Sequence, residues 1–508
     1  MARDGWLARD GWLGAVTLGL SLALLVAFLW FRDLPMVDLP QHAAQIATWQ
    51  RWDAGVPEII ARFELNFRTP YLLSYPLARA LAPLVGAVVA LKLVVWAAIV
   101  LSLAATKTLA RRLGHDPWLG LLGLVTATGL CFYFGFISFM LAMPLAVFGL
   151  VVALAHAEAP RLGTGALLAC LSCLLLTAHG VAFVMGFGCV ALTLLRGGGR
   201  VVLRLAPLIP PLLLGAMFFA PGPVSVRIGG DAWELSWFRL VELPALLVGM
   251  SSADHFSFAL GLALMAAALF TLRTRLSRIP ERLLPLGLLA AAYLLFPGMF
   301  RGIVLLHTRL PCFLLPVVLL ALEPRAVTAT LERAVARGAV LAVTLTWLAV
   351  FCWRLGAFNR EAAAFHALEA RLRPGLAMRP LVFERECSAF PGVPAFLHYS
   401  AYYLVDKGGW QGYSFAMYPL SVVRYRPDVV AGMQGGAEWH PDAFRPSELG
   451  QYDYFLVRSS HDRSDDLFAG APVALEAHVG PWWAYARQEA PVISALAPLP
   501  GGTINAAR

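Results

Sequence analysis

The stretch GTGALLACLSCLLLTAHGVAFVMGFGCVALTLL, residues 163–195, decides how the rest of the chain is read. It is apolar throughout, but it is longer than the run of about twenty residues that crosses a bilayer core as one helix. It is therefore either one overlong, tilted helix or two short helices hinged at His179-Gly180. The choice fixes which side of a membrane every later loop faces.

Other apolar segments occupy most of residues 1–355, which we expect to form a membrane domain. They lie near residues 12–31, 83–109, 117–134, 136–156, 205–220, 257–272, 283–297, 303–322 and 338–355. The mean hydropathy of +0.69 and the charged fraction of 14% are far from soluble composition. The chain is therefore predicted to be a polytopic α-helical membrane protein.

Arginines distinguish one helix from two in residues 163–195. With one helix there, Arg196, Arg200 and Arg204 would face outside. With two helices they fall inside, together with Lys107, as the positive-inside rule expects. The sequence therefore predicts two helices at this place and about eleven spans in all.

This topology starts inside and places three segments outside: a first loop at 32–82, a loop at 221–256, and the tail from 356. The inner loops then hold roughly twice as many Lys and Arg as the outer membrane loops. The net charge of +9 thus reflects topology. No nucleic-acid partner is expected, because no basic stretch is interleaved with aromatic residues. The first span, Trp12–Phe31, is too long for a signal peptide and lacks a cleavage site, so we expect it to be retained.

Residues 356–508 have a different composition, rich in Tyr, Trp, Pro, Gly and acids, and contain no spanning segment. Their length suits one domain. Residues 380–383 and 452–457 are typical of short buried strands, and Phe396–Asp406 is typical of a helix stopped by Gly408-Gly409. We expect a small extracytoplasmic α/β domain.

Three titratable residues gather in the first outer loop: Asp33, Asp38 and His42. A helical pattern begins near Leu39, so Asp38 and His42, four residues apart, would share one face just outside the membrane. A carboxylate beside an imidazole at the mouth of a helical bundle is a candidate general base with an orienting partner. Asp38 followed by Gln41 also fits a capping box, in which the aspartate closes the helix N-terminus. The two roles are compatible.

Further polar residues lie at membrane depth, where ionisable groups are costly and usually functional. His179 sits at the outer hinge of the two short helices, and we expect it to contact substrate. Arg301, His307 and Arg309 lie at the outer start of the penultimate span, and a guanidinium fork suits phosphate oxygens. The alternative for Arg309 is a structural ion pair with an acid of an outer loop, such as Asp254.

The tail offers aromatic residues that suit sugar rings, because exposed aromatic side chains stack on such rings. We single out the segment from His398 to Trp410 as substrate-binding. Packing in the core of the domain is the alternative for most of these aromatic residues.

The chain resembles the GT-C superfamily of membrane glycosyltransferases, which use polyprenyl-phosphate sugars. Its members place an Asp in the first outer loop, often followed by a second acid, with a His or Tyr four residues on. Met36-Val-Asp38-Leu-Pro-Gln-His42 matches the Asp and the His, whereas Leu39 replaces the second acid. The stretches Phe134–Pro144 and Thr177–Phe183 resemble uncharacterised bacterial proteins grouped near that superfamily.

The resemblance implies transfer of a sugar from a polyprenyl-phosphate donor to a hydroxyl of a glycan, lipid or protein acceptor on the outer face. Asp38 would be the general base, with Asp33 as the other acid of the loop. The donor phosphate would lie near Arg309, Arg301 or His307. Because the leaving group is already a good one, no cofactor is expected and no metal is strictly required, although a divalent metal stays open as an alternative that the sequence does not indicate.

Two other classes stay open: a lipid or glycolipid transporter or flippase, and a non-catalytic scaffold for envelope assembly. No convincing internal repeat relates the two halves, whereas transporters commonly show one. An enzyme should bury Asp38 at the floor of an outward cavity that opens to lipid, and a scaffold would leave it as a solvent-exposed cap. The heavy use of Ala, Leu and Arg suggests a GC-rich bacterium, so the expected location is the bacterial cytoplasmic membrane with the tail outside.

Overall fold

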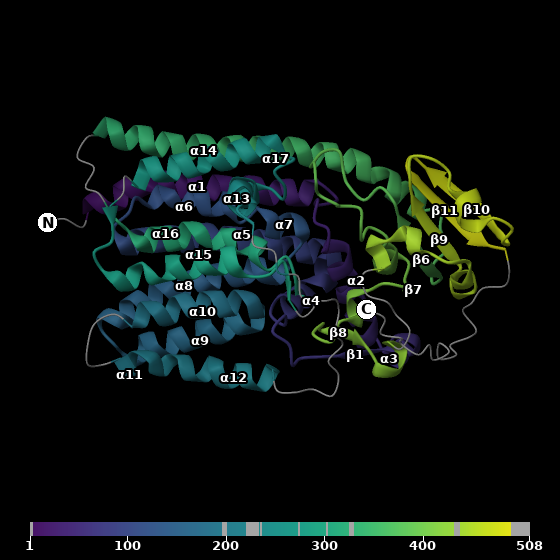
Figure 1. The fold of residues 1–508 in the computed structure, drawn as a ribbon, viewed down its shortest axis with the longest axis horizontal. Helices are drawn as coiled ribbons and strands as arrows, with labels where there is room; N and C mark the ends of the chain where they lie inside the picture. The colour runs from purple at the N-terminus through teal and green to yellow at the C-terminus, as the bar shows by residue number, and fades with distance from the viewer. Residues whose placement is uncertain are drawn as a thin grey trace.

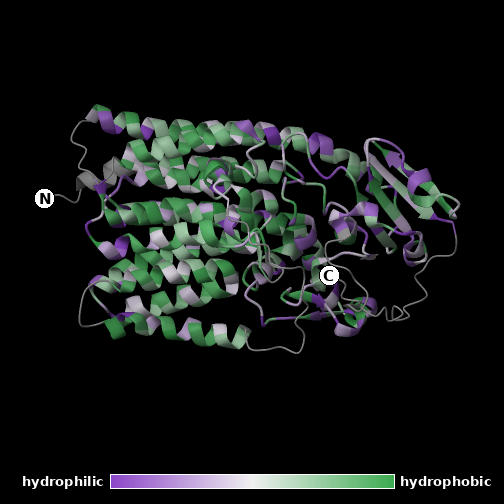
Figure 2. Ribbon diagram, viewed as in Figure 1, coloured by the Kyte–Doolittle hydropathy of each residue, from purple (hydrophilic) through white to green (hydrophobic). Residues whose placement is uncertain are grey.

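The computed structural model describes residues 4–195, 201–219, 233, 236–272, 275–300, 303–324, 330–430 and 437–488. Its helices run side by side along the long axis of the molecule, and a small sheet packs at one end of this bundle (Figure 1). Hydrophobic residues dominate the bundle, and hydrophilic residues are more frequent in the part that contains the sheet (Figure 2). The fold is that of a polytopic α-helical membrane protein with a small C-terminal α/β region, as predicted.

Seven helical segments in the described part of the chain are long and apolar enough to cross a membrane. Four of them are single helices: α5 (Ala87–Leu113), α8 (Ile137–Glu158), α14 (His255–Leu272) and α17 (Thr330–Glu369). A fifth, Gly11–Trp30, is the main part of α1 (Asp4–Trp30). The other two are Pro117–Phe134, which contains α6 (Gly120–Thr126) and α7 (Leu130–Phe134), and Val201–Phe218, which contains α11 (Val201–Leu205) and most of α12 (Ile209–Phe219). Shorter helices in the same bundle are α9 (Leu162–Ala178), α10 (Gly180–Leu194), α15 (Leu284–Leu295) and His307–Ala321, which contains α16 (Leu314–Ala321). Each apolar segment predicted from the sequence overlaps at least one of these helices, and the segment 163–195 overlaps two.

The stretch 163–195 forms two helices, and the hinge is His179, as predicted. α9 ends at Ala178 and α10 begins at Gly180. His179 has an extended backbone (φ −165, ψ 124), and its Nδ1 accepts hydrogen bonds from the backbone N–H groups of Val181 (3.1 Å) and Ala182 (3.4 Å). This is the geometry of an N-cap, supplied here by an imidazole. α9 and α10 lie side by side in the bundle (Figure 1).

The segment between α1 and α5 lies at the domain end of the bundle. It forms α2 (Leu39–Asp53), α3 (Pro57–Arg62), β1 (Phe63–Leu65) and α4 (Ser74–Val85). β1 pairs antiparallel with β8 (Val423–Tyr425) of the C-terminal domain. The Arg51 guanidinium also donates to the carbonyl oxygens of Leu404 (2.7 Å) and Val405 (2.8 Å). The first loop and the C-terminal domain are therefore packed together.

The loop before α14 also contains a helix, α13 (Phe238–Val248), which packs against α14.

The predicted boundary between the membrane domain and the C-terminal domain, at residue 356, falls inside helix α17, which runs unbroken to Glu369. The sheet that follows has the order β10 (Val473–Val479), β11 (Trp482–Arg487), β9 (Tyr454–Arg458), β6 (Ala377–Val382), β7 (Trp410–Gln411). β6 is parallel to its neighbours β7 and β9, and the other pairs are antiparallel. β6 and β9 overlap the two strands that the sequence predicts.

The predicted helix Phe396–Asp406 is shorter in the structure, where α18 covers Ala401–Asp406 and turns precede it. It ends before Gly408 and Gly409, whose φ angles of 74° and 90° favour glycine. The remaining short elements are α19 (Pro427–Val430), α20 (Ser464–Phe468) and two ladders, β2–β5 (Arg275–Leu276, Leu322–Glu323) and β3–β4 (Met299–Phe300, Ile303–Val304).

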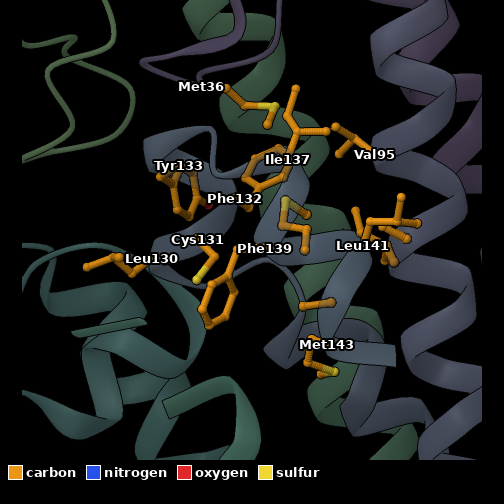
Figure 3. Close-up of a cluster of buried hydrophobic side chains, with 14 of the residues drawn as sticks. Met36, Val95, Leu130, Cys131, Phe132, Tyr133, Ile137, Phe139, Leu141 and Met143 are labelled. Atoms are coloured by element: carbon orange, nitrogen blue, oxygen red, sulfur yellow. The ribbon is translucent and has the colours of Figure 1, made fainter. Parts of the chain in front are cut away.

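An apolar cluster under the first loop fixes the path of the chain that leads to Asp38. Met36 of the loop belongs to the same buried cluster as Phe132, Tyr133 and Ile137 (Figure 3). The next residue, Val37, donates its backbone N–H to the Tyr133 carbonyl (2.9 Å). The loop is thus anchored on α7 immediately before the acid.

Candidate active site

Asp38 sits where the first loop crosses the end of α7. Its backbone N–H donates to the Phe134 carbonyl (3.0 Å). Gly135 permits this approach, because a Cβ there would lie 2.8 Å from the Asp38 nitrogen and the φ of Gly135 is +88°. Any larger residue at this position would be both strained and in collision with Asp38. The Phe134–Pro144 stretch noted in the sequence therefore holds the acid in place.

The Asp38 side chain is 6% exposed and does not cap α2. Its backbone angles (φ −93, ψ −8) are helical, whereas a capping residue usually has the extended angles that direct its side chain back to the first turn. The predicted capping box is therefore wrong, and Gln41 instead accepts a hydrogen bond from the backbone N–H of Phe415 (3.2 Å). The carboxylate remains available for another role.

The imidazole that faces Asp38 belongs to His398 of the C-terminal domain, with Nε2 3.5 Å from Oδ1. The His398 ring stacks on Tyr413 (centroids 5.2 Å apart, 13° between planes) and meets Phe415 edge-on (5.6 Å). Burial, together with the smaller effect of the nearby His42, lowers the pKa of His398 to about 3, so His398 is neutral near pH 7.

Burial raises the pKa of Asp38 well above its ordinary value. The positive charge of Arg309 opposes this effect, and the negative charge of Glu438 adds to it. Asp38 is thus a carboxyl group whose basicity is increased by its surroundings, which is what a general base requires.

His42 lies one turn along α2 from Asp38 but has other partners. Its Nδ1 lies 2.7 Å from the Tyr75 hydroxyl, and its ring packs edge-on against Phe415 (5.4 Å). Burial lowers the pKa of His42 to about 4. In the described part of the chain its ring makes no hydrogen bond to the Asp38 side chain, so the structure brings His398, and not His42, against the acid.

Arg309 is buried (6% exposed) in the 3₁₀ helix His307–Phe313, where its span begins. Its Nη2 donates to the Val304 carbonyl (2.8 Å), its Nε donates to the Leu305 carbonyl (3.2 Å), and its guanidinium lies 3.6 Å from the ring centre of Phe136. None of the described carboxylates forms an ion pair with it. A buried guanidinium that forms no ion pair favours an anionic ligand.

His179 faces Arg309, with Nε2 3.4 Å from Nη1. Because Nδ1 of His179 accepts backbone hydrogen bonds, a neutral ring carries its proton on Nε2. Two donors then point at each other, an arrangement that an oxygen accepting from both would relieve. The ring is held by Tyr71 (4.8 Å, edge-on) and Phe139 (5.0 Å). The structure thus brings His179 and Arg309 together.

Leu305, whose carbonyl fixes Arg309, has a φ of 56°. In the described part of the chain, Leu305 is the one non-glycine residue with a positive φ. A leucine in this region costs on the order of 1–3 kcal/mol and persists only where its surroundings hold it. Such outliers cluster at ligand sites, and this one positions the Arg309 side chain.

The other two predicted phosphate ligands are Arg301 and His307. Arg301 lies outside the described residues. His307 packs against Tyr293 of α15 (6.0 Å between ring centres). The alternative for Arg309, an ion pair with Asp254, is wrong: Asp254 pairs with Arg354 through both carboxylate oxygens.

Asp33 is occupied by contacts to α17. Its Oδ2 lies 2.9 Å from Nε2 of His366, whose Nδ1 lies 3.4 Å from Glu369. Its backbone N–H and C=O each bond the Asn359 side chain (both 2.9 Å). Asp33 therefore joins the first loop to the helix that enters the C-terminal domain.

Trp410, predicted to bind substrate, stacks on Tyr452 (5.4 Å between ring centres, 15° between planes) beside the second hydrophobic core of the domain.

Five residues that contact or act on the predicted site residues were not singled out from the sequence: Tyr71, Tyr75, Phe136, Glu438 and His366. Phe136 lies inside a stretch that was quoted for the resemblance. No group of three or more His, Cys, Asp or Glu that could hold a metal ion occurs within the described ranges.

The fold is similar to that of ArnT from Cupriavidus metallidurans, solved bound to undecaprenyl phosphate and in the apo state. Both comparisons give a TM-score of 0.55, with 13% and 14% identity, over 94% of this chain and 98% of ArnT. The fold is also similar to that of the arabinofuranosyltransferase AftD from Mycobacteria, with a TM-score of 0.54 and 17% identity over 95% of this chain and 42% of AftD.

ArnT and AftD are GT-C membrane glycosyltransferases, so the predicted resemblance to this superfamily is confirmed for the fold. Comparison of the sequence with protein-family models and with curated proteins gives no match.

Proposed function

We propose that this chain transfers a sugar from a polyprenyl-phosphate-linked donor to an acceptor hydroxyl, with Asp38 as the general base. One observation carries the proposal: a buried carboxyl group, not used as a helix cap, interacts through its charge with a buried arginine that forms no ion pair with any described carboxylate. A base and an anion-binding group are the two groups that this reaction needs.

The chemistry follows from these residues. Asp38 accepts the proton of the acceptor hydroxyl as its oxygen forms a bond to the anomeric carbon. The bond between that carbon and the phosphate oxygen breaks, and the electron pair leaves with polyprenyl phosphate. Arg309 and the Nε2–H of His179 stabilise the negative charge on the departing phosphate. Asp38 then returns its proton to solvent.

The fold supports a lipid-linked donor, because ArnT, which has a similar fold, has been solved bound to undecaprenyl phosphate. The positions of the arginines in the predicted inner loops support an outer location for the site. The heavy use of Ala, Leu and Arg supports the cytoplasmic membrane of a bacterium. The burial of Asp38 favours an enzyme over a scaffold, for which we expected an exposed cap.

The experiment is turnover of radiolabelled polyprenyl-phosphate sugars by the purified protein in nanodiscs. We expect Asp38→Asn to lower turnover at least about a hundredfold, because a general base contributes that much or more. Asp116→Asn, at an acid that caps a short helix and pairs with Arg337, is the control and should retain activity. Full activity in Asp38→Asn would remove Asp38 from the mechanism. No turnover with any donor, from folded protein that binds the lipids, would favour a transporter or a scaffold.

A further inference from the structure

A cleft of about 660 Å³ lies beyond the C-terminal half of α2, between the first loop and the C-terminal domain. Trp49 and Trp52 of α2 line it, as do Phe67 of the loop and Arg426 of the domain. Trp49 is eleven residues along the chain from Asp38, which places it about 16 Å away along the helix axis. The cleft is therefore separate from the site around Asp38, but the same rigid helix supports both.

Three aromatic side chains form its apolar wall. Phe67 is 51% exposed, and its ring centre lies 5.7 Å from that of Trp49. Trp52 lines the cleft, and its Nε1–H is buried without a hydrogen-bond partner in the described structure. The indole ring, and not this buried N–H, is therefore the part of Trp52 that the cleft offers to a ligand.

The charged side chains of the cleft are balanced. Asp53 accepts a hydrogen bond from Arg79 Nε (2.9 Å), and both residues line the cleft. Glu64, also in the lining, pairs with Arg424 (2.6 Å), and Arg426 donates to the Ile60 carbonyl (3.0 Å). The lining thus has two acids and two arginines, and it offers hydrogen-bonding groups of both kinds without a net charge. The formal charges of the four lining residues sum to zero.

We propose that this cleft binds an uncharged oligosaccharide segment of the acceptor. The apolar C–H faces of sugar rings suit the Trp and Phe rings, and their hydroxyl groups suit the paired acids and arginines. The volume is in the range of sites for such ligands. That the oligosaccharide belongs to the acceptor rests on the proposed transfer reaction, and α2 connects the cleft to the loop that carries Asp38.

Binding is tested on full-length Asp38→Asn protein in nanodiscs, which holds glycans without turning them over. The probe is an array of neutral hexose and pentose oligosaccharides, with acidic and amino-sugar glycans of matched length. We expect binding to neutral oligosaccharides. Trp52→Ala and Phe67→Ala should each weaken the affinity about tenfold, as the loss of one aromatic contact predicts. Trp237→Ala, at an aromatic residue that is 68% exposed and does not line the cleft, should leave the affinity unchanged.

Four results overturn the inference: no binding to any glycan, preference for acidic glycans, preference for amino-sugar glycans, or equal affinity in Trp52→Ala and Phe67→Ala. A separate turnover assay distinguishes this inference from the proposed function. Transfer that depends on Asp38 while the cleft variants retain wild-type acceptor KM overturns the acceptor role of the cleft and leaves the transferase intact. Binding that depends on Trp52 without turnover of any donor supports the cleft as a saccharide site and contradicts the transferase.

Discussion

His398 of the C-terminal domain places its Nε2 3.5 Å from Oδ1 of Asp38 in the first loop. Two segments that are distant in the sequence thus make one site, and the connections β1–β8 and Arg51 to Leu404 hold them together. Because His398 is neutral and stacked on Tyr413, it can fix the Asp38 carboxylate without competing for its charge. Its role in the proposed reaction is to position the base.

We expect His398→Phe to lower kcat on the order of tenfold with a smaller change in KM, because the stacked ring is kept and the nitrogen facing Asp38 is lost. His398→Gln, which restores a donor, should recover part of the rate. The measurement is steady-state turnover of the lipid-linked donor. His461→Phe, at an exposed histidine, is the control. An unchanged kcat in His398→Phe would rule out the positioning role.

The rate should rise with pH through the pKa of Asp38, because the base acts only when it is deprotonated. Since burial raises this pKa, the acidic limb of the kcat/KM profile should lie well above pH 3.8, the ordinary value of an aspartate. Glu438 raises the pKa of Asp38 further, so Glu438→Gln should move the limb to lower pH by on the order of one unit. A shift to higher pH, or none, would show that Glu438 does not act on the titrating group.

Arg309→Gln should lower turnover by about a hundredfold or more, since it removes the charge that stabilises the leaving phosphate. It should also weaken the binding of undecaprenyl phosphate, measured by native mass spectrometry.

The matched control for Arg309→Gln is Arg354→Gln, at an arginine that pairs with the buried Asp254. That variant should be less stable by about 3 kcal/mol, because Asp254 is left without its partner, yet it should bind the lipid as the wild type does. Equal loss of lipid binding in both variants would mean that Arg309 acts through folding.

The membrane part was predictable because each span is encoded locally. Apolar composition identifies the helices, and the arginines after residue 195 required the hinge at His179, which the structure has. The short strands β6 and β9 were visible as buried apolar runs. The start of α18 was not, because the turns at Phe396–Ser400 carry the same kind of residues as a helix.

The site was only half predictable. Asp38, Arg309 and His179 stand out as polar groups beside or within apolar segments. The partner of Asp38 could not be found in this way, because spacing along one helix favours His42, whereas the contact with His398 depends on how the domain packs on the loop. The role of Asp33 was hidden for the same reason, since His366 lies on α17.

The contact between Asp33 and His366 should make stability depend on pH. Burial opposes the protonation of His366, but the hydrogen bonds to Asp33 and Glu369 outweigh it and raise the pKa from 6.5 to about 9. A raised pKa stabilises the fold fully below the unfolded value, about pH 6.5, and this stabilisation is lost as the pH rises through 9. It amounts to at most about 3 kcal/mol. The wild type should therefore melt above His366→Gln at about pH 6, and the gap should shrink at about pH 10, measured by tryptophan fluorescence in detergent. A gap of equal size at both pH values would contradict a charged His366, and a gap that grows with pH would reverse its sign.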